Sequence, residues 1–246
     1  MKRIRIGRLL LFLFLLALAA GAAAAAPTVK NGYEMYRSAV AAVTPQQKAD
    51  EIRAQAHYTA LSELPPIYTD AVLSVEDRRF YSHCGIDPLA ILRAAGTDLA
   101  TGTLAEGGST ITQQLAKNLY YTQEKRFSRK VAEVFTAFAL ERAFTKDQLL
   151  ELYINSIYYG SGYYNIYDAA EGYFGKTPSE LSDAECTLLA GLPNAPSAYS
   201  LDASPELALE RQAQVLKKMV RNHKLTQAQA DTLHDEAAAL LAQRAG

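Results

Sequence analysis

The chain of 246 residues has no tryptophan, only two cysteines and almost balanced charge, with 25 basic and 26 acidic side chains. A net charge of −1 argues against a protein that binds nucleic acid through a broad basic surface. The cysteines, Cys84 and Cys186, are too few for a disulfide framework; we expect buried, unpaired thiols, and pairing after export stays open. The four histidines are scattered, so the sequence predicts no metal site.

Strand patterns are missing too, because no segment alternates apolar and polar residues convincingly. Helical signals are frequent instead. Apolar residues recur at helical spacing over residues 128–144, and capping patterns begin at Thr44, Thr145 and Ser182. With 49% hydrophobic residues the chain can bury a sizeable core. We therefore expect an all-α (mainly α) domain over residues 45–246.

The N-terminus contains the one long apolar run. Residues 9–26 carry no charge and follow four basic residues, which predicts export of everything after the run. As a helix this run extends about 27 Å, close to the hydrocarbon thickness of about 30 Å. Two interpretations of residues 1–26 are open: a signal anchor that stays in the cell membrane, or a secretory signal peptide cut within the small residues 21–26. We interpret residues 27–44 as a tether.

Glu76 is the first candidate for chemistry, because it closes the apolar run of residues 71–75. A carboxylate at the end of an apolar helix is partly desolvated, which favours a proton acceptor. The simpler alternative is an ion pair with Arg78 or Arg79 at the helix end. Packing alone explains poorly the polar and aromatic residues that follow at fixed steps: Asp77, Phe80, His83 and Gly85.

A second segment, residues 107–117, is rich in hydroxyl and amide groups that suit sugar and phosphate oxygens. It contains Ser109, Thr110, Gln113, Gln114 and Lys117.

A third segment places Glu133 after several cations. The simple explanation is an ion pair with Arg129 on a solvated helix face. The alternative is a diphosphate site, in which several cations converge on one anionic group. The candidates are Lys117, Lys125, Arg126, Arg129 and Lys130.

These segments resemble the peptidoglycan glycosyltransferases of glycosyltransferase family 51, which occur in class A penicillin-binding proteins and as monofunctional transglycosylases. The matching strings are E-D-R-R-F-Y-S-H-C-G, G-G-S-T-I-T-Q-Q-L-A-K-N, R-K-V-A-E, L-E-L-Y-I-N, A-A-E-G-Y-F-G-K and L-L-A-G-L-P, in order over residues 65–199. The resemblance implies a lysozyme-like, mainly helical fold and polymerisation of lipid II. The sequence contains no Ser-x-x-Lys or Lys-Thr-Gly, so we expect no transpeptidase activity.

The resemblance also implies roles for single residues. Glu76 is expected to take the proton from the acceptor GlcNAc 4-hydroxyl, which attacks the donor MurNAc with inversion and releases undecaprenyl diphosphate. Glu133 is expected to organise the diphosphate end. The residues expected to bind or frame the substrate are Asp77, Phe80, His83, Ser109, Thr110, Gln113, Gln114, Lys117, Lys125, Arg126, Arg129 and Lys130. The sequence departs from the family at residues 125–128, so Lys125 and Arg126 are alternatives for one diphosphate contact.

The remaining expectations concern partners and rivals. The resemblance implies lipid II, the growing lipid-linked strand and the membrane as partners, with other cell-wall synthesis proteins, and no nucleic acid. Relatives use a divalent cation, magnesium or manganese, near the diphosphate, although the sequence has no self-standing metal motif. Residues 86–104 are either core or membrane-facing. The rival functions are a lysozyme-type hydrolase, which needs no cation cluster, and a non-catalytic binding module.

Overall fold

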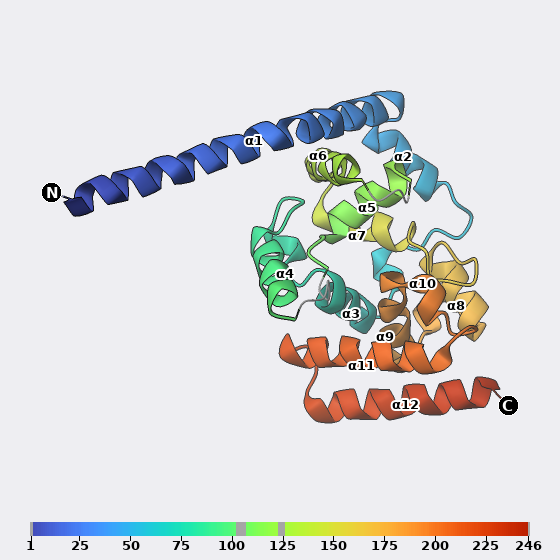
Figure 1. The fold of residues 1–246 in the computed structure, drawn as a ribbon. Coiled ribbons are helices and arrows are strands. Elements are labelled where there is room, and N and C mark those ends of the chain that lie inside the picture. The colour runs from blue at the N-terminus through green and yellow to red at the C-terminus, as the bar shows by residue number, and fades with distance from the viewer. Residues whose placement is uncertain (1, 102–106, 123–125, 246) are drawn as a thin grey trace.

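The computed structural model describes residues 2–101, 107–122 and 126–245, and within these ranges it is helical, with one isolated bridge between Gly160 and Tyr163 (Figure 1). The expected mainly helical class is thus confirmed. The helices are α1 (Lys2–Ala42), α2 (Pro45–Arg53), α3 (Pro66–Glu76), α4 (Pro88–Thr101), α5 (Ile111–Tyr120), α6 (Phe127–Ala143), α7 (Lys146–Ile154), α8 (Ile166–Phe174), α9 (Asp183–Gly191), α10 (Pro196–Tyr199), α11 (Pro205–Arg221) and α12 (Gln227–Ala245).

Side-chain caps start several of these helices. Thr44, Thr145 and Ser182 each accept a hydrogen bond from the third residue of their helix, as the capping patterns predict. Thr110 caps α5 in the same way. The sequence assigned that segment to sugar contacts, because a capping box and a polar binding loop use the same residue types.

Two groups of helices build the core. In one, α3, α9 and α11 pack against each other; in the other, α5 packs against α6 and α7. Tyr68 of α3 and Tyr153 of α7 are completely buried. The two groups meet where α3 ends and α5 begins, which brings the end of one apolar helix next to the start of another.

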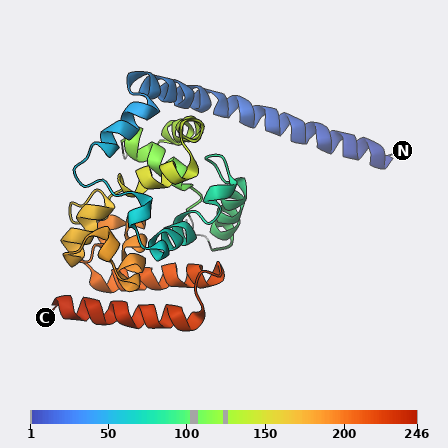
Figure 2. The same cartoon turned by 180° about the vertical axis from the view of Figure 1, so that it is seen from behind.

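The N-terminal helix α1 is longer than the sequence predicts. The expected tether, residues 27–44, is helical up to Ala42 and continues the apolar run without a break, with Pro27 inside the helix. The second half of α1 packs along α6, and the first half extends away from the domain (Figures 1 and 2). Among the described residues, one helix, over Phe12–Ala42, is long and apolar enough to cross a membrane, and its most apolar stretch is fully exposed.

Candidate active site

Glu76 lies at the last residue of α3, at the edge of the core. The helix buries Ala71 and Val72, so its packing fixes where the carboxylate stands. The side chain of Glu76 is 8% exposed. Its Oε2 accepts a hydrogen bond from Gln114 Nε2 at 2.8 Å. The carboxylate is therefore largely desolvated and held at one oxygen, which suits a group that must accept a proton at a defined place.

Gln114 is itself oriented by a buried tyrosine. The Tyr153 hydroxyl donates to Gln114 Oε1 at 3.2 Å, so the amide nitrogen faces Glu76. Burial, and next the Glu76 carboxylate, raise the pKa of Tyr153 well above its ordinary value. The tyrosine thus stays a donor at any physiological pH. The sequence predicted Gln114 as a site residue but did not single out Tyr153.

Arg211 of α11 faces the same carboxylate. Its Nη2 lies 3.6 Å from Glu76 Oε1, and its side chain is also 8% exposed. The guanidinium donates to the Gly191 carbonyl at 3.3 Å and to Gln214 Oε1 at 2.9 Å, which hold it in place. Sequence analysis missed Arg211. The available signal was a cation on the apolar stripe of α11, between the buried Ala208 and Val215.

Asp77, the next residue after Glu76, ties three segments together from a buried position. Its carboxylate accepts from His83 Nε2 at 2.9 Å and from the Ile111 amide at 3.0 Å, at the start of α5. His83 Nδ1 accepts from the Gly85 amide, so the ring proton lies on Nε2, facing Asp77. Thr110 Oγ1 donates to the Gly85 carbonyl at 2.6 Å. The hydrogen-bonding groups of these side chains are thus occupied within the protein. Their role is therefore to position the segments around Glu76.

Gly85 is required where it stands. Its φ of +97° is in the region that favours glycine, and a Cβ there would lie 3.3 Å from the backbone of Ala137 in α6. Phe80 is completely buried, with the Lys146 amino group 4.5 Å from the ring centroid. Gln113 is 2% exposed, and its Oε1 accepts from the Thr110 amide. As placed, Phe80 and Gln113 shape the site from within the protein.

The cation cluster gathers around Glu133, on α6. Arg129 Nη1 lies 2.7 Å from Glu133 Oε1, and Lys130 Nζ lies 3.1 Å from Oε2 and 2.6 Å from Ser109 Oγ. The expected Arg129–Glu133 pair therefore exists, but Glu133 is 3% exposed and not on a solvated face. Arg129 Nε and Nη1 and Glu133 Oε1 are buried without aligned hydrogen bonds. Nη1 and Oε1 still face each other in the ion pair, whereas Arg129 Nε has no partner, and such a donor suits an anionic oxygen.

Lys117 of α5 connects this cluster to Glu76. Burial lowers the pKa of Lys117; the Glu133 and Glu76 carboxylates oppose this, and Arg129 and Lys130 add to it. Both acids and both other cations therefore lie within electrostatic range of one amino group. The sequence predicted all five residues as site residues, and the structure brings them together.

Two further cations were predicted as site residues. Lys125 lies outside the described residues. Arg126 is exposed at the N-terminal cap of α6.

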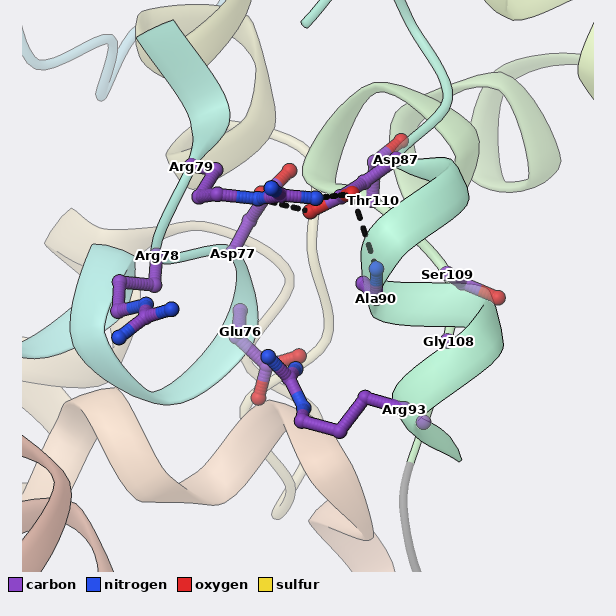
Figure 3. A pocket seen from close by; sticks show the side chains of 11 residues that line it. Glu76, Asp77, Arg78, Arg79, Asp87, Ala90, Arg93, Gly108, Ser109 and Thr110 are labelled. Carbon is purple, nitrogen blue, oxygen red and sulfur yellow. Dashed lines mark hydrogen bonds and ion pairs between the residues drawn. The ribbon is translucent and has the colours of Figure 1, made fainter. Parts of the chain in front are cut away.

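Further arginines lie around Glu76. Arg79 pairs with Asp87, through Nε at 2.9 Å and through Nη2, so it is not the ion-pair partner of Glu76 that the sequence suggested. Arg78 and Arg93 line one pocket with Glu76, and the Arg93 side chain reaches toward the Glu76 carboxylate (Figure 3). Arg93 comes from α4 and was not predicted as a site residue.

The expectations about cysteines and metals have different outcomes. Cys84 and Cys186 are both unpaired; Cys186 is buried, and burial raises the pKa of its thiol to about 12. Cys84 is exposed, so the expected burial is wrong there. Among the described residues, no group of three His, Cys, Asp or Glu side chains could hold a metal ion.

Comparison with known proteins follows the same segments. The sequence pattern of the transglycosylase family matches residues 44–220. Penicillin-binding protein 1A of Aquifex aeolicus is 47% identical over 169 residues, 69% of this chain and 23% of that protein. A Cupriavidus necator protein named as a transglycosylase is 43% identical over 174 residues, 71% of this chain and 75% of that protein.

Other relatives are longer than this chain. Penicillin-binding protein 1A of Neisseria gonorrhoeae is 42% identical over 73% of this chain, but only 22% of its own length is matched. The crystal structure of penicillin-binding protein 1A from Haemophilus influenzae shares 22% identity over 73% of this chain and 17% of that one, with a TM-score of 0.41. The chain spans less than a quarter of these penicillin-binding proteins.

A helical domain with two buried acids beside a cation cluster defines the class of site, and the matched residues define the family. The chain belongs to the transglycosylase family, the peptidoglycan glycosyltransferases, as its motifs predict.

Proposed function

We propose that this protein polymerises lipid II into glycan strands by inverting glycosyl transfer. The observation that carries the proposal is that α5 and the loop before it reach both charged centres: Gln114 donates to Glu76 at 2.8 Å, and Lys130, which pairs with Glu133, donates to Ser109 at 2.6 Å. One site thus holds a desolvated acid beside cations that suit a diphosphate. A hydrolase of the lysozyme type has no use for such cations.

In the proposed reaction Glu76 accepts the proton of the GlcNAc 4-hydroxyl on the acceptor. The hydroxyl oxygen forms the β-1,4 bond to the anomeric carbon of the donor MurNAc as the bond to the diphosphate oxygen breaks. Lys117, Arg129 and Lys130 stabilise the negative charge that the leaving undecaprenyl diphosphate takes with it. Since this leaving group is already good, the site needs no general acid. Glu133 holds the cations in place between turnovers.

The surrounding residues take supporting roles in this proposal. Ser109 and Gln114 contact the two charged centres directly, at Lys130 and at Glu76. The buried residues Asp77, Phe80, His83, Thr110 and Gln113 position the segments that carry them. Arg126 and Lys125 stay candidates for a diphosphate contact.

The test is an assay with lipid II and purified protein, run with and without magnesium or manganese. We expect uncrosslinked glycan strands, and we expect Glu76→Gln to lose nearly all activity. Asp70→Asn is the matched control, because Asp70 is on the same helix and makes only a surface ion pair with Lys224 at 2.7 Å. Release of muropeptides from finished cell wall, without polymerisation, would reject the proposal in favour of a hydrolase.

We further propose that residues 45–246 form the catalytic domain and that residues 1–26 remain as a single-pass anchor, with the domain on the extracytoplasmic side. The unbroken α1 supports an anchor, since the small residues 21–26 lie within a helix that continues into the domain. The intact mass of protein extracted from membranes tests this. A chain that begins after residue 26 would show that the segment is a cleaved signal peptide.

A further inference from the structure

The second half of α1 is seated on the catalytic domain along one face. Residues 12–27 are exposed, whereas Thr28, Gly32, Tyr36 and Val40 are buried or partly buried. Their spacing of four residues places them on one side of a helix. The helix therefore contacts the domain from about Thr28 onward. The part before Thr28 extends away from the domain without contacting it.

At Gly32 the backbones of α1 and α6 approach each other closely. A Cβ at this position would lie 2.6 Å from the Ser128 carbonyl oxygen and 2.6 Å from Val131 Cβ, closer than real Cβ atoms come. Next to it, the Tyr33 and Tyr36 rings lie 5.1 and 5.8 Å from the Phe135 ring. Close backbone contact together with packed rings holds two helices in one fixed arrangement.

The helix that α1 is fastened to is the one that carries the cation cluster. Ser128, Val131 and Phe135 of α6 contact α1, and Arg129 and Glu133 of the same helix form the buried ion pair. A displacement of α1 relative to the domain is thus transmitted directly to the proposed diphosphate site.

The direction of α1 indicates which side of the domain faces the membrane. Its free half leaves on the same side of the domain as α4 (Figures 1 and 2). Helix α4 exposes Leu89, Ile91 and Leu92, which are 60%, 46% and 68% exposed. An apolar rod and an apolar helix face on one side define the side that meets a membrane.

We propose that α1 is a rigid spacer, fastened to α6 at Gly32, whose length sets how far the site stands from the membrane. Gly32 is its positioning residue. The inference rests on the proposed function, since a lipid-linked substrate must reach the site from the bilayer. It goes beyond that function because a flexible tether would serve an anchored enzyme equally well.

The experiment inserts eight residues between Ala26 and Pro27 of the full chain in two versions. A helical alanine-rich insertion lengthens the rod by about 12 Å. A glycine–serine insertion of the same length replaces the rod by a flexible tether. Each protein is reconstituted in liposomes of phosphatidylethanolamine and phosphatidylglycerol with lipid II, and each is also assayed in detergent with a short-chain, water-soluble lipid II analogue.

We expect the helical insertion to lose at least about tenfold in rate on liposomes and the flexible one to stay within about threefold, because the tether lets the domain return to the surface. Both should retain the unmodified rate on the soluble analogue. Equal liposome rates for the two insertions would overturn the inference. So would an equal loss on the soluble analogue, since that loss would come from damage to the fold.

A second measurement is independent of catalysis. The exposed Cys84 accepts a maleimide dye, while Cys186 is buried. Energy transfer from this dye to acceptor-labelled lipid headgroups reports the height of the domain. The helical insertion should reduce transfer and the flexible one should not; unchanged transfer in both refutes the spacer. If the unmodified protein fails to polymerise either substrate, the proposed function fails and this height measurement still decides the inference.

Discussion

The Tyr153 hydroxyl donates to Gln114 Oε1, and Gln114 Nε2 in turn donates to Glu76 Oε2. An amide can present either end to a carboxylate, and only the nitrogen end is favourable. The buried tyrosine therefore decides which end faces the proposed base.

Tyr153→Phe tests this relationship. Without the hydroxyl, Gln114 loses its orienting donor while the ring still fills the core. We expect kcat to fall about fivefold to tenfold with little change in KM, and the free energy of unfolding to fall by about 1 kcal/mol. Steady-state polymerisation kinetics and denaturant titration measure both. Tyr81→Phe is the control, because it removes a hydroxyl that donates only to the peripheral Asp147. An equal kcat loss in both variants would contradict the orienting role.

Arg211→Ala removes the cation that faces Glu76 Oε1, and we expect about a hundredfold loss of kcat with partial recovery in Arg211→Lys. Lysine retains the charge but not the contacts to Gly191 and Gln214, so full recovery is not expected. Arg221→Ala, an exposed position on the same helix, is the control. If the alanine and lysine variants were equally inactive at unchanged thermal stability, the charge itself would not be the cause.

Lys117→Met should separate stability from activity. Burial lowers the pKa of Lys117, so the folded state binds this proton less tightly than the unfolded state does. The folded protein therefore loses stability below the lowered pKa, and recovers it as pH rises toward the ordinary value of 10.5. We expect Lys117→Met to be more stable than the parent at pH 7, with a gap that narrows toward pH 10, and to be inactive. A variant less stable at pH 7 would show that the attraction of Glu133 and Glu76 for Lys117 outweighs its desolvation.

Gly32→Ala should destabilise the protein although alanine is the better helix former. In an exposed helix this change is worth about 1 kcal/mol in favour of alanine. At Gly32 the new methyl group would overlap Ser128 and Val131, so we expect a net loss of about 1–3 kcal/mol in the free energy of unfolding. Gly21→Ala is the matched control, because nothing lies within 4 Å of a Cβ there. Thermal unfolding in detergent distinguishes the two. Equal melting temperatures would show that α1 and α6 can separate at no cost.

The local signals in the sequence were sufficient for the helical class and for several helix starts, and they proposed the residues around Glu76 and Glu133. Capping at Thr44, Thr145 and Ser182 depends on residues three positions apart, so it can be read directly from the chain. The motifs around Glu76, Gln114 and Glu133 identify the family. The same kind of local evidence did not show that residues 27–42 are helical, because no residue there indicates that the helix packs on α6.

What the sequence by itself determined is the class of fold and the family, and it proposed the two acids with their cations, because these depend on residue types at short spacing. Only the tertiary structure decided which groups surround them. Arg211 reaches Glu76 from a helix far along the chain, and Asp77 and His83 are occupied by the start of α5. Gly32 meets α6 across nearly a hundred residues of sequence. Such contacts arise from packing between distant segments, and no spacing along the chain encodes them.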